Sequence, residues 1–151
     1  MQKLFKHIFF SFLILTAGGA GAADKAAQDQ AVALVKKAAA YLQANGKDKA
    51  FAEFNNPKGQ FAERDLYVFV NDLEGNTLAH GGNPKLVGKN VMELKDADGK
   101  LFIKEMTELA KTKGKGWVDY KWPNPVTKAI EAKTTYVERA GDVLIGCGIY
   151  K

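Results

Sequence analysis

The stretch YVFVNDLEGNTLAH, residues 67–80, decides the fold. Residues 66–70 are a run of β-branched and aromatic residues, which is typical of a strand. Residues 71–76 have the asparagine, aspartate and glycine content of a turn, and residues 77–80 continue as a second strand. Two short strands joined by such a turn predict an antiparallel hairpin.

Helical periodicity marks three segments around this hairpin, at residues 24–45, 47–55 and 98–113. Their apolar residues recur three and four positions apart, which places them on one side of a helix. We therefore expect a long N-terminal helix, a short helix after it, and a further helix on the far side of the hairpin.

Three more strands are expected after the last helix, at residues 116–122, 129–139 and 143–150. Prolines at 123 and 125 end the first of them, because proline cannot donate to a strand ladder. Clustered hairpins with helices before and between them predict an α+β domain. Its sheet would have five antiparallel strands, with the long N-terminal helix and a second helix packed on it.

The N-terminus has the order of a secretory signal peptide. Lys3 and Lys6 precede an almost unbroken apolar run at residues 8–17, and small residues fill positions 18–23. The alternative is an uncleaved anchor helix. The apolar run, however, is about half of the roughly 20 residues that a membrane span needs.

The small residues place the cleavage site. Ala20, Gly21 and Ala22 match the A-x-A pattern, so we expect cleavage after Ala22 or after Ala23. Residues 23–151 would then form a single domain in the periplasm or outside the cell, and the mass of the secreted protein tests this.

Charge and cysteine content exclude several classes of protein. The 151 residues carry a formal charge of +5, which falls to +3 without residues 1–22. That excess is too small to indicate a nucleic-acid-binding protein. Cys147 is the only cysteine, so no intramolecular disulfide forms, and its place in an apolar run between two glycines predicts a buried core residue.

The sequence offers little support for an enzyme or a metal protein. It contains no nucleophile elbow and no phosphate loop. His80 is the only histidine after residue 22, which excludes multi-histidine metal sites, and a pair with Cys147 would need an exposed thiol. Residues 96–105 match part of a calcium loop, but Leu94 stands at the first ligand position, so a helix-capping turn at 96–99 is the simpler interpretation.

Five motifs, in this order, resemble the single Cache domain, the PAS-like extracellular ligand-sensing module of many bacterial receptors. Besides residues 67–80 they are VGKN (87–90) followed by DADG (96–99), GWVDYKWP (116–123), KTTYV (133–137) and GCGIY (146–150). The sequence looks most like stand-alone exported members of the family. The resemblance covers the chain from about residue 24 to its end.

The resemblance implies a PAS-like sheet with a pocket on one face for a small anionic ligand, often a short carboxylate, and no cofactor. Receptor members continue into a membrane helix and a signalling domain, whereas this sequence ends at Lys151. We therefore expect a sensory, chemotaxis-related binding module without chemical turnover, read by a membrane receptor or kinase in trans. The long first helix is a candidate homodimer surface.

Alternation of side chains sorts the candidate ligand residues by strand, but it leaves open which strand faces coincide. Tyr67, Phe69 and Asn71 share one face, and His80 shares one with Leu78. The resemblance implies that six residues approach the pocket: Tyr67, Phe69, His80, Tyr120, Trp122 and Lys133.

These side chains suit a carboxylate. Lys133 supplies a positive charge, Tyr120 and His80 can donate hydrogen bonds, and Trp122 offers an apolar wall. Each also has a plainer interpretation, since a strand lysine is usually exposed, aromatic strand residues are usually core, and Asn71 belongs to turn chemistry. The competing hypothesis is a structural or interaction protein that kept the fold but has no working pocket. An open polar pocket lined by Lys133 and Tyr120 would favour ligand binding, and a filled sheet face would favour the competitor.

Overall fold

The structure is a computed structural model that describes residues 19–151, so the apolar run of the predicted signal peptide lies outside the described residues. Its elements in chain order are α1 (Gly19–Asn45), α2 (Lys47–Phe54), β1 (Ala62–Glu63), β2 (Leu66–Asp72), β3 (Thr77–His80), the 3-10 turn η1 (Pro84–Leu86), α3 (Phe102–Thr112), β4 (Lys115–Pro123), β5 (Ile130–Ala140) and β6 (Val143–Tyr150). None of the described helices is long and apolar enough to cross a membrane.

The predicted α+β fold is confirmed. The strands form one antiparallel sheet in the order β1-β2-β6-β5-β4, and β3 pairs with β2 as the predicted hairpin. Strand β1 was not predicted, because two residues are too few to show an alternating pattern. Helix α1 begins at Gly19, five residues before the predicted start.

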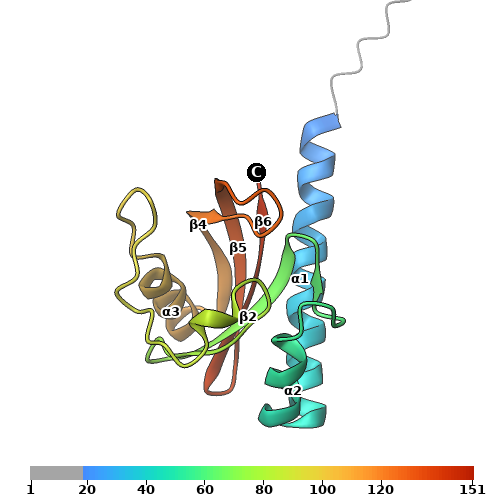
Figure 1. Cartoon of the computed structure of the whole chain (residues 1–151), viewed down its shortest axis with the longest axis vertical. Helices are drawn as coiled ribbons and strands as arrows, with labels where there is room; N and C mark the ends of the chain where they lie inside the picture. Colours follow the sequence, from blue (N-terminus) through green and yellow to red (C-terminus); the bar gives the residue numbers. More distant parts are fainter. Residues whose placement is uncertain (1–18) are drawn as a thin grey trace, which may run out of the picture.

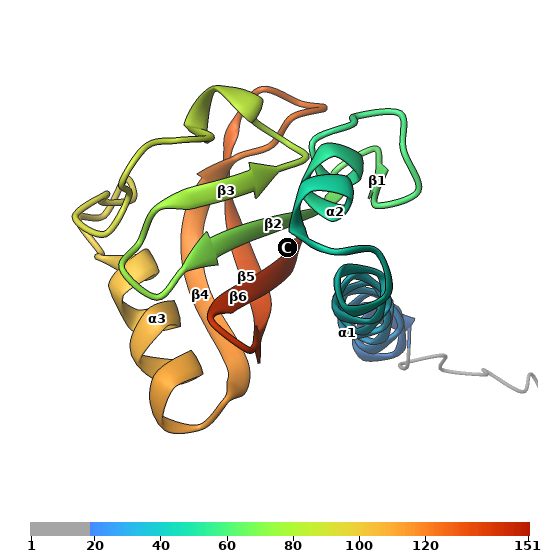
Figure 2. The ribbon, with the colours of Figure 1, turned by 90° about the horizontal axis from the view of Figure 1, so that it is seen from below.

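The helices cover opposite faces of the sheet, with α1 and α2 on one side and α3 on the other (Figures 1 and 2). On the α1 side, Phe54 and Phe61 meet edge to face at 4.7 Å in a core that also contains Val68 and Ile145. The N-terminal part of α1 extends beyond the sheet (Figure 1).

Cys147 lies in the α1-side core and is fully buried, as predicted. Burial raises the pKa of its thiol to about 12, so the reactive thiolate does not form near neutral pH. His80 borders a hollow on the other face of the sheet. The two residues therefore do not form the Cys–His pair that a nucleophilic enzyme would need.

The segment between β3 and α3, residues 84–101, crosses over the α3-side face and is called the crossing segment below. Its end differs from the prediction, since α3 begins at Phe102 and not at residue 98. Asp96 Oδ1 accepts the backbone N–H groups of Asp98 and Lys100 at 2.9 and 2.8 Å, which folds residues 96–100 into a tight turn before the helix.

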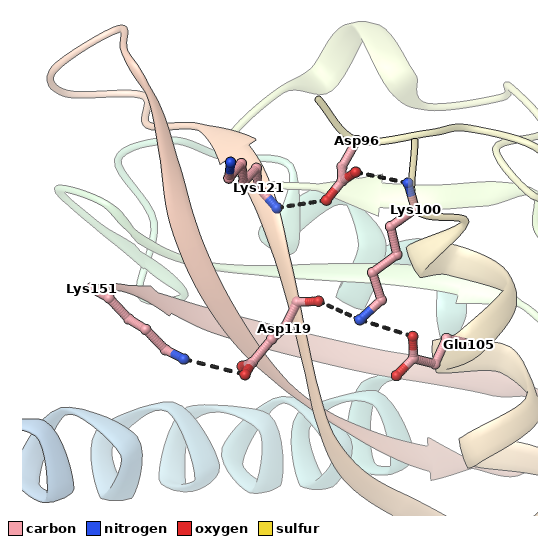
Figure 3. Close-up of polar contacts among 6 residues, drawn as sticks. All are labelled: Asp96, Lys100, Glu105, Asp119, Lys121 and Lys151. Atoms are coloured by element: carbon pink, nitrogen blue, oxygen red, sulfur yellow. Dashed lines mark hydrogen bonds and ion pairs between the residues drawn. The ribbon is translucent and has the colours of Figure 1, made fainter. Parts of the chain in front are cut away.

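The same carboxylate fastens the crossing segment to the sheet. Asp96 Oδ2 accepts the backbone N–H of Lys121 on the edge strand β4 at 3.0 Å, and Lys100 Nζ reaches the backbone carbonyl of Asp119 at 2.5 Å and Glu105 at 2.9 Å (Figure 3). The two Asp96 oxygens thus accept hydrogen bonds within the turn and from the edge strand, which fits the turn expected from the sequence at residues 96–99. Among the described residues no cluster of three metal-ligating side chains occurs.

Candidate functional site

The register of the sheet brings the six predicted ligand residues to the α3-side face. Tyr120 lies opposite Lys133, and Lys133 lies opposite Tyr150 on β6. Tyr67 joins them from β2 through a hydrogen bond to Lys133. The strand faces that carry the candidate residues therefore lie on the same side of the sheet, which the sequence alone could not establish.

Four of the six border one hollow between the sheet and the crossing segment: Phe69, His80, Tyr120 and Trp122. The other lining residues are Asn71, Thr77, Leu86, Val91, Leu94, Phe102 and Ile103. The free space inside the hollow is about 20 Å³, which is room for about one water molecule and far below the roughly 300–1,000 Å³ of small-molecule sites. The sheet face is thus nearly filled, and a ligand larger than a water molecule would enter only if the lining side chains moved apart.

Lys133 and Tyr67 do not line this hollow. This differs from the open pocket lined by Lys133 and Tyr120 that would favour ligand binding. Together with Tyr150 they form a cluster, called here the lysine–tyrosine cluster. Lys133 Nζ donates to Tyr67 Oη at 2.7 Å and to Tyr150 Oη at 3.3 Å, and it lies 4.1 and 4.6 Å from the centres of the two rings.

The Lys133 ammonium is buried without a negative partner. The residue is only 1% exposed, although strand lysines are usually exposed, and it forms no ion pair with a described carboxylate. Burial lowers the pKa of Lys133 to about 7, because a charge is poorly solvated in the interior. An anion beside this amine would favour its charged form.

The tyrosines of the cluster are hydrogen-bond donors. Burial raises the pKa of Tyr67 well above its ordinary value, and the pKa of Tyr150 to about 12, so both hydroxyls keep their protons. Tyr150 donates its proton to the Pro123 carbonyl at 2.9 Å. Among the described residues, the Tyr67 hydroxyl has only the Tyr150 oxygen, 3.4 Å away, as a nearby acceptor. Its proton is therefore available to a ligand.

His80 joins the cluster to the hollow. Its ring lies 5.2 Å from the Tyr67 ring and 5.7 Å from the Phe69 ring. Its Nδ1 accepts the backbone N–H of Asn83 at 2.9 Å, so the neutral imidazole carries its proton on Nε2. Burial, followed by the charge of Lys133, lowers the pKa of His80 to about 3. His80 is thus a neutral donor at physiological pH.

Tyr120 and Trp122 act mainly as walls. The Tyr120 ring stacks on Phe102 at 4.3 Å with 5° between the planes, and Trp122 packs against Phe102 at 5.3 Å. The Tyr120 hydroxyl is hydrogen-bonded to Thr135 Oγ1 at 3.0 Å. Tyr120 therefore offers a ligand less donor capacity than the sequence suggested.

Two glycines of β6 make room for these side chains. A Cβ atom on Gly146 would lie 2.3 Å from the Phe69 ring, and one on Gly148 would lie 2.4 Å from Cε of Lys133 and 2.2 Å from Thr135 Oγ1. The GCGIY motif thus provides a flat strand on which Phe69 and the Lys133 stem lie.

Sequence reasoning missed Asn71, Thr77 and Tyr150. Asn71 alternates in step with Tyr67 and Phe69 on β2, so it shares their strand face. This alternation could have identified Asn71 as a lining residue, but its neighbours in the sequence suggested a turn. Thr77 was missed because a bulge at Val70/Asn71 shifts the β2–β3 register. The prediction that His80 and Leu78 share a face was wrong for this reason, since Leu78 packs against the α1-side core and Thr77 borders the hollow.

Comparisons with known proteins agree with this architecture. The family model Single Cache domain 2 matches residues 22–151. The chain belongs to this family. The resemblance found in the sequence motifs is therefore confirmed.

Similar solved structures include a chemotaxis protein and a Cache chemosensory domain. One is a methyl-accepting chemotaxis protein from Vibrio parahaemolyticus RIMD 2210633, with 26% identity, a TM-score of 0.71, and coverage of 86% of this chain and 92% of that one. Another is a Cache chemosensory domain described for carboxylic acid recognition, with 29% identity, a TM-score of 0.71, and coverage of 88% and 99%. Cache domains of this kind are ligand-sensing modules.

Curated relatives include the methyl-accepting chemotaxis protein McpP of Pseudomonas putida, 34% identical over 90 residues, and the sensor histidine kinase MctS of Rhizobium johnstonii, 35% identical over 89. Each match covers 58% of this chain but only 16% and 19% of the relatives' lengths. This Cache domain is thus related to a small part of a chemoreceptor and of a kinase.

The glycine strand yields a first prediction. Gly148→Ala should lower the free energy of unfolding by about 1–3 kcal/mol, because its Cβ collides with Thr135 and with the Lys133 stem. Urea denaturation measures this. The matched control is Gly141→Ala in the β5–β6 turn, where no heavy atom lies within 4 Å and only the positive φ of 65° opposes a side chain. A Gly148→Ala protein as stable as the wild type would contradict the packing described here.

Proposed function

We propose that this Cache domain is an exported sensor module that binds a short carboxylate without chemical turnover. The observation that carries the proposal is the buried Lys133 ammonium, which has no carboxylate partner among the described residues. A buried charge is costly unless it is paired, so the unliganded protein keeps a cost that an anion would offset.

Three donors would converge on the carboxylate. Lys133 uses two of its three N–H bonds on tyrosines, Tyr67 has a weakly engaged proton, and His80 presents Nε2–H. The proposal requires the carboxylate to reach from the hollow past His80 to the lysine–tyrosine cluster. The rest of the ligand would then lie against Phe69, Tyr120 and Trp122.

The size of the hollow limits both ligand and affinity. The best very small ligands gain about 1.5 kcal/mol per heavy atom. An acetate-sized ligand with about four such atoms would gain roughly 6 kcal/mol, which corresponds to a Kd of tens of micromolar. Support for a carboxylate comes from the similar Cache chemosensory domain whose structure concerns carboxylic acid recognition.

Export and signalling belong to the same proposal. Cleavage after Ala22 or Ala23 would leave residues 23–151 as one ligand-binding domain in the periplasm or outside the cell. A chemoreceptor or kinase in trans would read its occupancy, and the relatives with those activities support this. The part of α1 beyond the sheet is the proposed homodimer surface, which the molecular mass in solution tests.

Two observations favour the competing hypothesis of an interaction protein without a working pocket. The first is the hollow itself, which has room for only about one water molecule. The second concerns Lys133. The Lys133 amine is already hydrogen-bonded by two tyrosines and does not border the hollow. A closed cluster of this kind would leave the hollow uncharged. Direct binding measurements separate the two hypotheses.

The test replaces the positively charged Lys133 by an uncharged side chain of similar volume. In calorimetric titrations with acetate and propionate at pH 6.5, Lys133→Met should bind at least about 10-fold more weakly than the wild type, because a charge-assisted hydrogen bond contributes roughly 1.5–3 kcal/mol. Lys115→Met, an exposed lysine replaced on the neighbouring strand β4, should bind like the wild type. Unchanged affinity of Lys133→Met would remove Lys133 from the site. Failure of the wild type to bind any short carboxylate would favour the interaction protein.

The same variant isolates a pH effect. The folded-state pKa of Lys133, about 7, lies below its ordinary 10.5, so between these values the unfolded chain binds more protons. The contribution of Lys133 to stability therefore rises with pH from 7 to 8.5, by on the order of 1 kcal/mol per unit. Carboxylate affinity should fall over the same range, because the amine loses its charge. Urea denaturation at each pH gives the difference in free energy of unfolding between the wild type and Lys133→Met. This difference would stay constant from pH 7 to 8.5 if Lys133 had its ordinary pKa.

A further inference from the structure

A second space, called here the cleft, lies between helix α1 and the ends of strands β2 and β6. The β2–β6 ladder runs from Val68↔Cys147 to Asp72↔Val143, whereas β6 continues to Tyr150 and pairs beyond Cys147 with β5. The two strands therefore part after Cys147, and α1 borders the space between them.

The cleft is larger than the hollow and separate from it. Its free space is about 180 Å³, whereas one water molecule needs roughly 10–15 Å³. None of its lining residues borders the hollow: Ala27, Gln30, Glu63, Arg64, Asp65, Leu66, Gly148, Ile149 and Tyr150. The cleft therefore has room for a molecule of several heavy atoms.

The turn between β1 and β2 brings charges of both signs to the cleft. Arg64 and Asp65 are the two residues of this turn, because Glu63 pairs with Leu66. No ion pair among the described residues includes Glu63, Arg64 or Asp65. Gln30 adds a carboxamide from α1, which can both donate and accept hydrogen bonds. The lining thus offers one guanidinium and two carboxylates without salt-bridge partners in the described part of the chain.

Arg64 has an unfavourable backbone conformation in this turn. Its φ is 57°, in the left-handed region, where glycine and asparagine are the usual residues of a two-residue hairpin turn. Among the described residues other than glycine, only Lys128 in the β4–β5 loop also has a positive φ. Backbone strain of this kind clusters at binding sites. The chain therefore carries a charged side chain at the cleft where glycine would suit the backbone better.

The mixture of charges indicates the class of ligand. A simple anion at Arg64 would also approach two carboxylates, and a simple cation at Asp65 would also approach the guanidinium. A small zwitterion avoids both conflicts, because its carboxylate accepts hydrogen bonds from the guanidinium and its ammonium group donates to a carboxylate. Asp65 is the better acceptor of the two acids, since it is half-buried and Glu63 is exposed.

We propose that the cleft binds a small α-amino acid, with Arg64 holding the carboxylate and Asp65 holding the ammonium group. An α-amino acid carries its two charged groups on one carbon, which suits two residues that are neighbours in a tight turn. Tyr150 lines the cleft, and its hydroxyl accepts a hydrogen bond from Lys133, so this site adjoins the lysine–tyrosine cluster without using the hollow. The inference goes beyond the proposed carboxylate site and does not depend on it.

Three probes of similar size separate the two charges. L-Alanine carries both groups, propionate lacks the ammonium group, and ethylamine lacks the carboxylate. The backbone amide resonances of ¹⁵N-labelled protein report where each probe binds. L-Alanine should shift the resonances of residues 63–65, and propionate and ethylamine should need at least about 10-fold higher concentrations for the same shift, because each loses one charge-assisted contact.

The matched variants use the two positions of positive φ. Arg64→Gly removes the guanidinium and relieves the strained backbone. It should unfold at the same urea concentration as the wild type or a higher one, and it should bind L-alanine at least about 10-fold more weakly. Lys128→Gly relieves the same kind of strain outside the cleft and should bind L-alanine like the wild type. Asp65→Asn should weaken the binding of L-alanine as Arg64→Gly does.

The outcomes distinguish this inference from the proposed function. No shift of residues 63–65 with L-alanine, or equal shifts with L-alanine and propionate, would overturn the amino-acid site. Unchanged binding of L-alanine by Arg64→Gly would also overturn it. Each of these results would leave the carboxylate site at Lys133 standing. Absence of carboxylate binding at Lys133 would overturn the proposed function and leave the amino-acid site standing.

Discussion

A lysine ammonium buried between two tyrosines, with no carboxylate beside it among the described residues, is the interaction on which the site depends. It explains why β6 carries glycine where the Lys133 stem crosses it, and it adds to burial, the larger cause, in lowering the pKa of His80. It also gives the domain a reason to bind an anion, because the cost of burying the charge is present before the ligand arrives. The chemistry that we propose for the site is therefore recognition of charge.

The same face shows how a Cache fold builds a binding space. The crossing segment supplies three apolar wall residues, Leu86, Val91 and Leu94, and the Asp96 carboxylate fastens it to the edge strand β4 (Figure 3). That attachment also occupies backbone groups that an edge strand would otherwise expose. The hollow is thus bounded by a covering segment that Asp96 attaches to β4, and the sheet provides the polar lining groups.

Much of the fold could be predicted from the sequence, because the β2–β3 hairpin, the C-terminal strands and the apolar stripes of the helices have clear periods. The alternation of side chains along β2 correctly placed Tyr67 and Phe69 on one face. The register between strands could not be predicted in this way, because it depends on two strands at once. The bulge that turns Thr77 toward the hollow has no local signal. Turn-like neighbours concealed Asn71, and the burial of Lys133 depends on glycines in a strand 13 residues or more further along the chain.

The pKa of Lys133 with and without a carboxylate tests the account most directly. Protein labelled with ¹³C at lysine gives the titration of each Cε, and Lys133→Met identifies the resonance of Lys133. The account predicts a pKa of about 7 in the free protein and a clear rise in saturating acetate, because the bound anion stabilises the ammonium. A Lys133 that titrates near 10.5 without ligand, or whose pKa ignores acetate, would contradict it.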